Sequence, residues 1–346
     1  MTNALKRLWL GFTLILLASA FLLLSDWKQR SVAGGIPRVA ILQFNSVSLL
    51  DDGVRGMLDR LRENGFEPGR NIIYERFNAE NDMATANSIA KEMTSGKYGF
   101  AFTVSTNCLQ VVANANREGK IKHVFGVVAD PLAAKVGINP NNPLDHPKNM
   151  VGIGSLMPAG ELLELARTFN PHAQRFGLPW NPSQANSEMY TKAARVTAQK
   201  LGVELLEAAV DNTAAVGEVT SSLVSRGADA ILVLGDLTVG LGIDSVVTEA
   251  RKGKIPVLSV MPDTVPKGAL FAAGANFYEV GRQMGDMATQ VLKGEDLAHI
   301  PILYVMPKQY GVNLTALSGL KDQWRIPPEL IAKAAVVVDQ TGTHRK

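Results

Sequence analysis

Cysteine is nearly absent from this chain, since only Cys108 is found among its 346 residues. A single cysteine excludes an intrachain disulfide, even in an oxidising compartment. Cys108 has no activating group near it in the sequence, and we interpret it as a small apolar residue of a helix. It also lies too far from the apolar N-terminal run to be a lipid-anchor cysteine beside that run.

The motifs of common cofactor, metal and catalytic sites are also missing. The five histidines are scattered, and no two stand at the spacing of metal ligands. Gly152 and Gly154 begin like a dinucleotide-binding fingerprint, but Met157 stands where the third glycine is needed. The sequence contains neither a P-loop nor a Gly-x-Ser-x-Gly elbow. We therefore predict no metal, no cofactor and no catalytic residue.

Charge of one sign is not concentrated anywhere along the chain. The 35 basic and 32 acidic residues leave a net charge of +3, and no basic stripe suits a phosphate backbone. We expect no nucleic-acid partner. Apolar residues are plentiful at 46%, which allows a large core. The 300 or so residues after the N-terminal segment are enough for two domains of about 150 residues each.

A long uncharged run at residues 8–25 follows Lys6 and Arg7. This order is typical of a secretory signal, so we expect the rest of the chain at the periplasmic or extracellular face, without ready access to cytosolic cofactors. As a helix the run would span about 27 Å, close to the hydrocarbon thickness of a bilayer. Residues 18–20, Ala-Ser-Ala, resemble a cleavage site, but Phe-Leu-Leu-Leu follows them. Residues 1–30 are thus either a cleaved signal peptide or a membrane anchor.

From residue 38 onward, short β-rich apolar runs alternate with segments of helical periodicity. This alternation is typical of βα units that build parallel sheets, and it predicts an α/β fold. The first series predicts strands at 39–44, 71–77, 98–104 and 123–128, with helices at 48–64, 82–94 and 108–117. The second predicts helices at 160–169, 187–201, 215–225 and 243–251, with strands at 175–178, 203–210, 230–234 and 256–260.

The two series resemble each other in sequence. Residues 61–67 are similar to 199–204, and residues 95–104 are similar to 225–234. Two similar halves, each too long to be a single motif, predict two lobes with a cleft between them.

Polar or aromatic residues follow several predicted strands, and open α/β sheets bind ligands at the carboxyl ends of their strands. These residues are Ser105, Thr106, Asn107, Asp130, Trp180, Asp236, Thr238 and Asp263. Ser105 to Asn107 also open a helix, whose free N–H groups suit an anionic group such as a carboxylate. Helix capping competes with ligand binding at each polar position, but their recurrence in both halves favours one shared site. We expect Trp180 to stack on a flat ligand rather than merely to cover the cleft edge.

Several longer runs resemble one family. They include Trp180 to Ser187 (Trp-Asn-Pro-Ser-Gln-Ala-Asn-Ser), Phe277 to Gly285 (Phe-Tyr-Glu-Val-Gly-Arg-Gln-Met-Gly), Lys267 to Leu270 and Ile326 to Leu330. With Asp130-Pro131 they resemble the solute-binding proteins of ABC transporters, in particular the family with tryptophan- and tyrosine-binding members. The resemblance covers residues 38 to 338.

The resemblance implies a type I periplasmic-binding-protein fold, in which two Rossmann-like lobes with parallel sheets are joined by a three-segment hinge. It implies that residues 36–155 with 276–298 form the first lobe, and that residues 156–275 with 299–340 form the second. By the same analogy Thr106, Asp130, Asn181 and Asp236 face the ligand. Asn107, Asn276 and the segment Asn45-Ser46-Val47-Ser48 depart from the residues usual in this family. We nevertheless expect Asn45, Ser46, Asn107 and Asn276 at the ligand. The family often has aspartate at 276, a plausible partner for an amino-acid ammonium.

Three functions follow as hypotheses. The first is a monomeric, extracytoplasmic solute-binding protein that captures a small organic molecule, possibly an amino acid or related metabolite, and delivers it to an ABC permease. The second is a ligand sensor for a signalling partner, held at the membrane by residues 8–25 if these are uncleaved. The third, an enzyme on the same scaffold, has the least support because no histidine or cysteine pairs with the acids at the strand ends.

Overall fold

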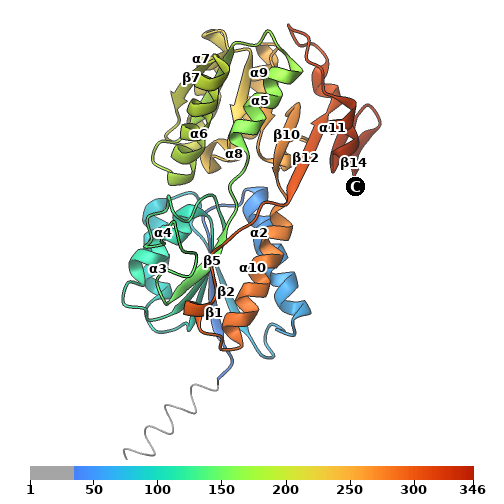
Figure 1. Cartoon of the computed structure of the whole chain (residues 1–346). Helices are drawn as coiled ribbons and strands as arrows, with labels where there is room; N and C mark the ends of the chain where they lie inside the picture. The colour runs from blue at the N-terminus through green and yellow to red at the C-terminus, as the bar shows by residue number, and fades with distance from the viewer. Residues whose placement is uncertain (1–34) are drawn as a thin grey trace, which may run out of the picture.

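The computed structural model describes residues 35–346, so the apolar run at 8–25 lies outside the described residues. Two lobes stand one above the other, each built around its own sheet (Figure 1). Among residues 35–346, no helix combines the length and the apolarity that crossing a bilayer requires.

The first lobe contains a six-stranded sheet in the order β11-β5-β4-β3-β1-β2, with every pair parallel. Its strands are β1 (Arg38–Gln43), β2 (Ile73–Asn78), β3 (Phe100–Val104), β4 (Lys122–Val128), β5 (Met150–Gly154) and β11 (Leu303–Tyr304). Its helices are α2 (Ser48–Glu63), α3 (Met83–Met93), α4 (Thr106–Ala115) and α10 (Phe277–Leu292). Helix α3 packs beside α4, and α10 packs along α2 (Figure 1).

The second lobe contains an eight-stranded sheet in the order β14-β13-β12-β10-β9-β8-β6-β7. Its strands are β6 (Arg175–Trp180), β7 (Glu204–Ala209), β8 (Ala230–Val233), β9 (Val257–Ser259), β10 (Phe271–Ala275), β12 (Lys308–Asn313), β13 (Val336–Asp339) and β14 (Gly342–Arg345). Its helices are α5 (Ala159–Phe169), α6 (Ala185–Leu201), α7 (Val216–Ser225), α8 (Leu237–Leu241), α9 (Ile243–Lys252) and α11 (Pro328–Lys333). The β10–β12 and β13–β14 pairs are antiparallel, in an otherwise parallel sheet.

The two lobes share one strand topology, as the similarity of the two sequence halves predicts. The order β2-β1-β3-β4-β5 in the first sheet matches β7-β6-β8-β9-β10 in the second. The predicted α/β fold is thus confirmed. In both sheets the strand order reverses beside the first strand, so the loops after β1 and β3, and after β6 and β8, border a crevice at the carboxyl ends of the strands.

The chain passes between the lobes three times, which confirms the three-segment hinge. The passages follow β5, β10 and β11, and hydrogen bonds join them: Val305 N donates to Gly154 O (2.9 Å), and Asn276 N donates to Pro307 O (2.8 Å). One boundary differs from expectation. Strand β11 lies in the span 299–340 assigned to the second lobe, yet Leu303 pairs with Ile153 on the first sheet. Strand β11 hydrogen-bonds to backbone groups of β5 that would otherwise be unpaired at the edge of the first sheet.

A buried histidine in the first sheet makes folding stability depend on pH. His123 is inaccessible to solvent, its Nε2 lies 2.8 Å from Thr103 Oγ1, and burial lowers its pKa to about 3. An unfolded histidine has a pKa near 6.5, so below that pH the unfolded chain binds a proton that the folded chain does not. The free energy of unfolding therefore falls as the pH drops from about 6.5 towards 3.

We expect the replacement His123→Gln to remove this part of the pH dependence. Between pH 7 and pH 5 the wild-type chain should lose about 2 kcal/mol more stability than the variant, from the difference of one bound proton. Urea unfolding of both proteins at the two pH values measures this. An equal loss in both proteins would show that His123 is not the titrating group.

Candidate functional site

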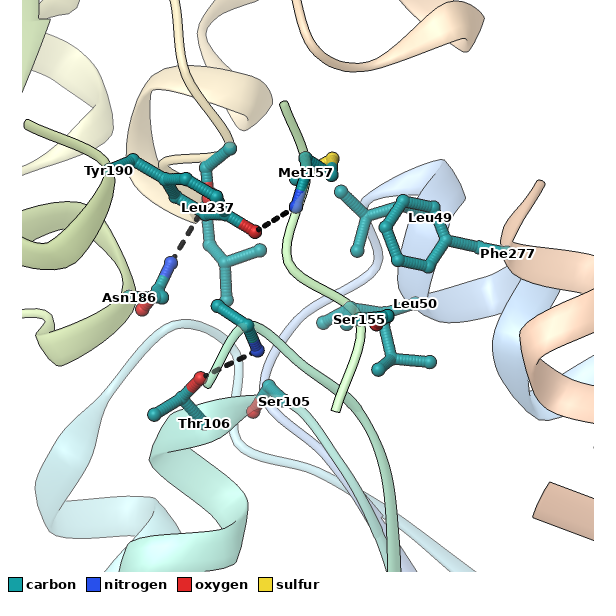
Figure 2. Close-up of a pocket in the computed structure, with 13 residues that line it drawn as sticks. Leu49, Leu50, Ser105, Thr106, Ser155, Met157, Asn186, Tyr190, Leu237 and Phe277 are labelled. Carbon is teal, nitrogen blue, oxygen red and sulfur yellow. Dashed lines mark hydrogen bonds between the residues drawn. The ribbon is translucent and has the colours of Figure 1, made fainter. Parts of the chain in front are cut away.

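A pocket lies in the crevice between the lobes, and both lobes contribute to its wall (Figure 2). Its lining consists of Leu49, Leu50, Ser105, Thr106, Val127, Ala129, Ser155, Met157, Asn186, Tyr190, Gly235, Leu237 and Phe277. The volume open to the centre of a water molecule is only about 20 Å³, which is room for one or two waters. The lobes are therefore closed on each other more tightly than a bound organic ligand allows, and they must separate to admit one.

The backbone is strained where two neighbouring strands of the first sheet reach the pocket. Ser105, directly after β3, has φ of +112°, and Val127, near the end of β4, has φ of +53°. A β-branched residue in the left-handed region is a genuine outlier. The register between β4 and β5 shifts at this point, between Phe125 and Val128. Such strain clusters at binding and active sites, where the surrounding structure holds the loops in one conformation.

Helix α4 begins at this strained loop. The hydroxyl of Ser105 accepts a hydrogen bond from Cys108 N (3.1 Å), so Ser105 is the N-cap of the helix. The hydroxyl of Thr106 accepts from Ala129 N (3.4 Å), which ties the ends of β3 and β4 together. The helix therefore points its N-terminus, with its partial positive charge, at the pocket.

Two buried polar atoms in the pocket wall have no hydrogen-bond partner among the described residues. They are Ser155 Oγ and Asn186 Oδ1, in side chains that are 2% and 6% exposed. The amide nitrogen of Asn186 donates to Gly235 O (3.0 Å), which holds its carboxamide in place. Buried polar atoms are nearly always hydrogen-bonded in folded proteins, so two orphans in one pocket indicate a site for ligand polar groups.

Tyr190 closes the pocket from the second lobe. Its hydroxyl oxygen accepts a hydrogen bond from Met157 N (3.4 Å) in the first passage between the lobes (Figure 2). Burial raises the pKa of Tyr190, so the phenol stays protonated and keeps its hydrogen for donation.

A cluster of neutral side chains joins the two lobes beside the pocket. We call it the Thr238 amide cluster, and its members are Asn45, Asn81, Asn181, Gln184 and Thr238. The hydroxyl oxygen of Thr238 accepts from the amides of Gln184 (2.7 Å), Asn181 (3.3 Å) and, across the cleft, Asn81 (3.1 Å). Asn45 in turn donates to Asn81 Oδ1 (3.0 Å). These bonds fasten the lobes in the closed arrangement.

The bilobed fold, the hinge and the pocket between the lobes are those of a known family. Residues 38–338 match the model of the ABC transporter substrate-binding proteins. The chain belongs to this family. The family resemblance drawn from the sequence is thereby confirmed.

Relatives of this substrate-binding protein agree with the assignment. It is 28% identical over 285 residues to the tyrosine-binding protein of Clostridioides difficile strain R20291, covering 82% of this chain and 81% of the relative. A conserved domain protein from Vibrio cholerae has the same fold, with a TM-score of 0.82, 26% identity and coverage of 88% of this chain and 100% of that chain. A domain from Streptococcus pneumoniae in complex with L-Trp gives a TM-score of 0.81 at 23% identity, with the same coverage.

Asp236 of this substrate-binding protein was expected at the ligand, but its carboxylate is already occupied by its own chain. It accepts hydrogen bonds from Asn181 N (2.6 Å), Ser187 Oγ (2.5 Å) and Val239 N (2.8 Å). Burial is the largest influence on the carboxyl and raises its pKa. Asp236 therefore locks the loop after β8 to the loop after β6.

Four other expected site residues lie outside the pocket lining. The ring of Trp180 lies beneath the guanidinium of Arg195, whose Cζ is 5.4 Å from the centre of the ring. The side chain of Asn276 caps α10 and accepts a hydrogen bond from Glu279 N (3.2 Å). Ser46 is exposed, and its hydroxyl accepts a hydrogen bond from the side-chain amide of Asn78 (2.8 Å). The fourth, Asp263, lies near Ser48 of the first lobe, and burial raises its pKa.

The remaining expected residues lie close to the pocket. Asp130 accepts from Leu132 N (2.9 Å) and lies near the Tyr304 hydroxyl, whose pKa it helps to raise. Asn107 is buried in α4, and its side-chain nitrogen has no partner among the described residues. Cys108 is buried in the same helix, as interpreted from the sequence, and burial raises its pKa to about 12.

Of the twelve expected residues, two line the pocket and three belong to the Thr238 amide cluster. The first two are Ser105 and Thr106, and the other three are Asn45, Asn181 and Thr238. Sequence reasoning missed Ser155, Asn186 and Tyr190. Asn186 falls within the run Trp180 to Ser187 that carries the family resemblance, and Tyr190 follows it by one helical turn.

Proposed function

We propose that this protein captures a small organic ligand between its lobes outside the cytoplasm and, as a monomer, delivers it to an ABC permease. The observation that carries the proposal is the pocket built from both lobes, with Ser155 Oγ and Asn186 Oδ1 buried there without partners. A bound ligand can supply the hydrogen-bond partners that these two atoms lack among the described residues.

Capture would work by a population shift between open and closed arrangements. The first lobe offers the hydroxyl of Thr106 and the N-terminus of α4, and the second offers Asn186 and Tyr190. A ligand that contacts both lobes stabilises the closed state, which already has the Thr238 amide cluster in place. Closure then becomes the signal by which a permease distinguishes the loaded protein from the empty one.

The first ligands to test are aromatic amino acids and related metabolites, because one relative is a tyrosine-binding protein and one similar structure is bound to L-Trp. At a concentration of 100 times its Kd, a true ligand should stabilise the folded state by about 2.7 kcal/mol. This corresponds to a rise in melting temperature of roughly 2 to 4 °C. Small-angle X-ray scattering should show a more compact particle in the presence of the same compound.

A matched pair of variants makes this test specific to the pocket. Asn186→Ala should abolish the thermal shift, while Asn87→Ala, an exposed position of α3, should leave it unchanged. Melting and scattering curves that stay constant across a broad panel of amino acids and related metabolites would contradict the proposed function.

A membrane-tethered sensor is the second candidate, and the length of the uncharged run at residues 8–25 favours it. In this case the same closure would be read by a signalling partner. Intact-mass measurement of the native protein distinguishes the two, because loss of the first twenty or so residues removes the tether.

A further inference from the structure

None of the side chains that line the pocket is charged. Its walls are apolar at positions such as Leu49, Leu50, Leu237 and Phe277, and its polar groups are neutral hydroxyls, a phenol and a carboxamide (Figure 2). The two unpartnered atoms, Ser155 Oγ and Asn186 Oδ1, are also neutral. Any charge on a ligand would therefore be buried here without a side chain of opposite charge in contact.

The carboxylates nearest to the pocket already have partners. Asp236 accepts three hydrogen bonds from its own lobe. Asp130 accepts from Leu132 N, and its charge acts on the nearby hydroxyls of Tyr304 and of Tyr190 in the lining. Position 276, next to Phe277 of the lining, carries an amide that caps α10. An ammonium group in the pocket would touch only neutral oxygens of the lining side chains.

Burying an unpaired charge costs far more free energy than burying a neutral amide whose hydrogen bonds are made. The partial charge at the N-terminus of α4 compensates an anion only in part, and no side chain of the pocket lining carries a charge that would compensate a cation. A neutral ligand can form hydrogen bonds with the unpartnered polar groups of the pocket without burying a charge. Its N–H or O–H groups can donate to Asn186 Oδ1 and Ser155 Oγ, and its carbonyl can accept from the first turn of α4.

From this we infer that the pocket selects uncharged molecules, such as carboxamides that carry an apolar body, over amino-acid zwitterions. The inference rests on the proposed function and specifies the substrate class of the same site. It also assigns Asn186 as the residue that sets this preference, because its carboxamide oxygen is the unpaired acceptor that the second lobe places in the pocket lining.

Four compounds with one phenyl body and different charges test the inference. They are 3-phenylpropanamide (neutral), 3-phenylpropanoate (anion), 2-phenylethylamine (cation) and L-phenylalanine (zwitterion). Isothermal titration of the purified full chain should give a Kd for the amide at least tenfold lower than for each charged compound. A comparison of 4-methylpentanamide with L-leucine repeats the test on an aliphatic body.

The outcomes separate this inference from the proposed function. If L-phenylalanine or L-leucine binds as tightly as its amide counterpart, the inference is wrong and the solute-binding function stands. If none of these compounds and no member of the broader panel binds, the proposed function fails and this inference fails with it.

Introducing a negative charge at Asn186 gives an independent test. Asn186→Asp should improve the binding of 2-phenylethylamine at least tenfold and weaken that of 3-phenylpropanamide. Asn212→Asp places the same new charge at an exposed position of the second lobe and should change neither affinity. An Asn186→Asp protein that melts cooperatively and keeps the wild-type order of affinities would overturn the inference. Should that variant not fold, the wild-type titrations decide the question by themselves.

Discussion

Replacing Gly281 with alanine is expected to destabilise the protein by about 3 kcal/mol. Gly281 lies in α10, where this helix crosses α2 at backbone contact. A β-carbon at Gly281 would overlap the carbonyl group of Gly53, and one at Gly56 would overlap that of Tyr278. The obstacle is backbone rather than a flexible side chain, so the two helices would have to move apart. Urea unfolding of the wild type and the variant measures the loss.

Gly217 provides a matched control for this prediction. It also lies within a helix, α7, but the nearest atom to an added β-carbon is Ser245 Cβ at 3.5 Å, an ordinary contact. Alanine has the higher helix propensity, so Gly217→Ala should leave stability unchanged or raise it by up to about 1 kcal/mol. Similar effects of the two replacements would mean that helix propensity, and not the close crossing of α2 and α10, decides the outcome at Gly281.

Thr238→Val is expected to weaken ligand binding by about ten- to a hundredfold and to shift the protein towards the open arrangement. Valine keeps the shape of threonine but removes the oxygen that accepts from Asn81, Asn181 and Gln184. In the closed state these amides would be buried without an acceptor, whereas in the open state water reaches them. The closed state therefore loses stability relative to the open one. Titration with the best ligand and small-angle scattering of the ligand-free protein measure the two effects.

Thr248 offers the corresponding control. Its hydroxyl is exposed on α9 and donates to Asp244 O (2.7 Å) within the same helix, far from any contact between the lobes. Thr248→Val should change neither the affinity nor the scattering curve. Unchanged affinity in Thr238→Val would show that the Thr238 amide cluster contributes nothing to closure.

The fold of the first half could be read from local patterns because its strands and helices have clear periodicities. The expected helix at 48–64 and strand at 123–128 agree with α2 and β4 to within one residue. Strand β5 was not predicted, because two glycines interrupt its apolar run, and Gly152 is required by the close approach of Phe125. Strands β12 to β14, with antiparallel β10–β12 and β13–β14 pairs, were also missed, since they form only when the chain returns to the second lobe after its last passage.

The candidate site was predictable where topology alone places a residue. Ser105 and Thr106 line the pocket because they follow β3 at the point where the strand order reverses. The same rule also led to Asp236, which follows β8 and whose carboxylate accepts hydrogen bonds from the helix it caps and from Ser187. Local sequence does not distinguish a polar group that binds a ligand from one that holds a loop.

The sequence by itself determined the alternation of strands and helices, the two similar halves and the lack of cofactor motifs, because these depend on residues close together in the chain. Only the tertiary structure decided which polar groups remain unpartnered between the lobes. Asn186 Oδ1 and Ser155 Oγ are unpartnered because the fold places no donor or acceptor of the described residues within hydrogen-bond distance of them. Hydrogen-bond satisfaction depends on long-range packing, and a ligand can bind only to the groups that the fold leaves unpaired.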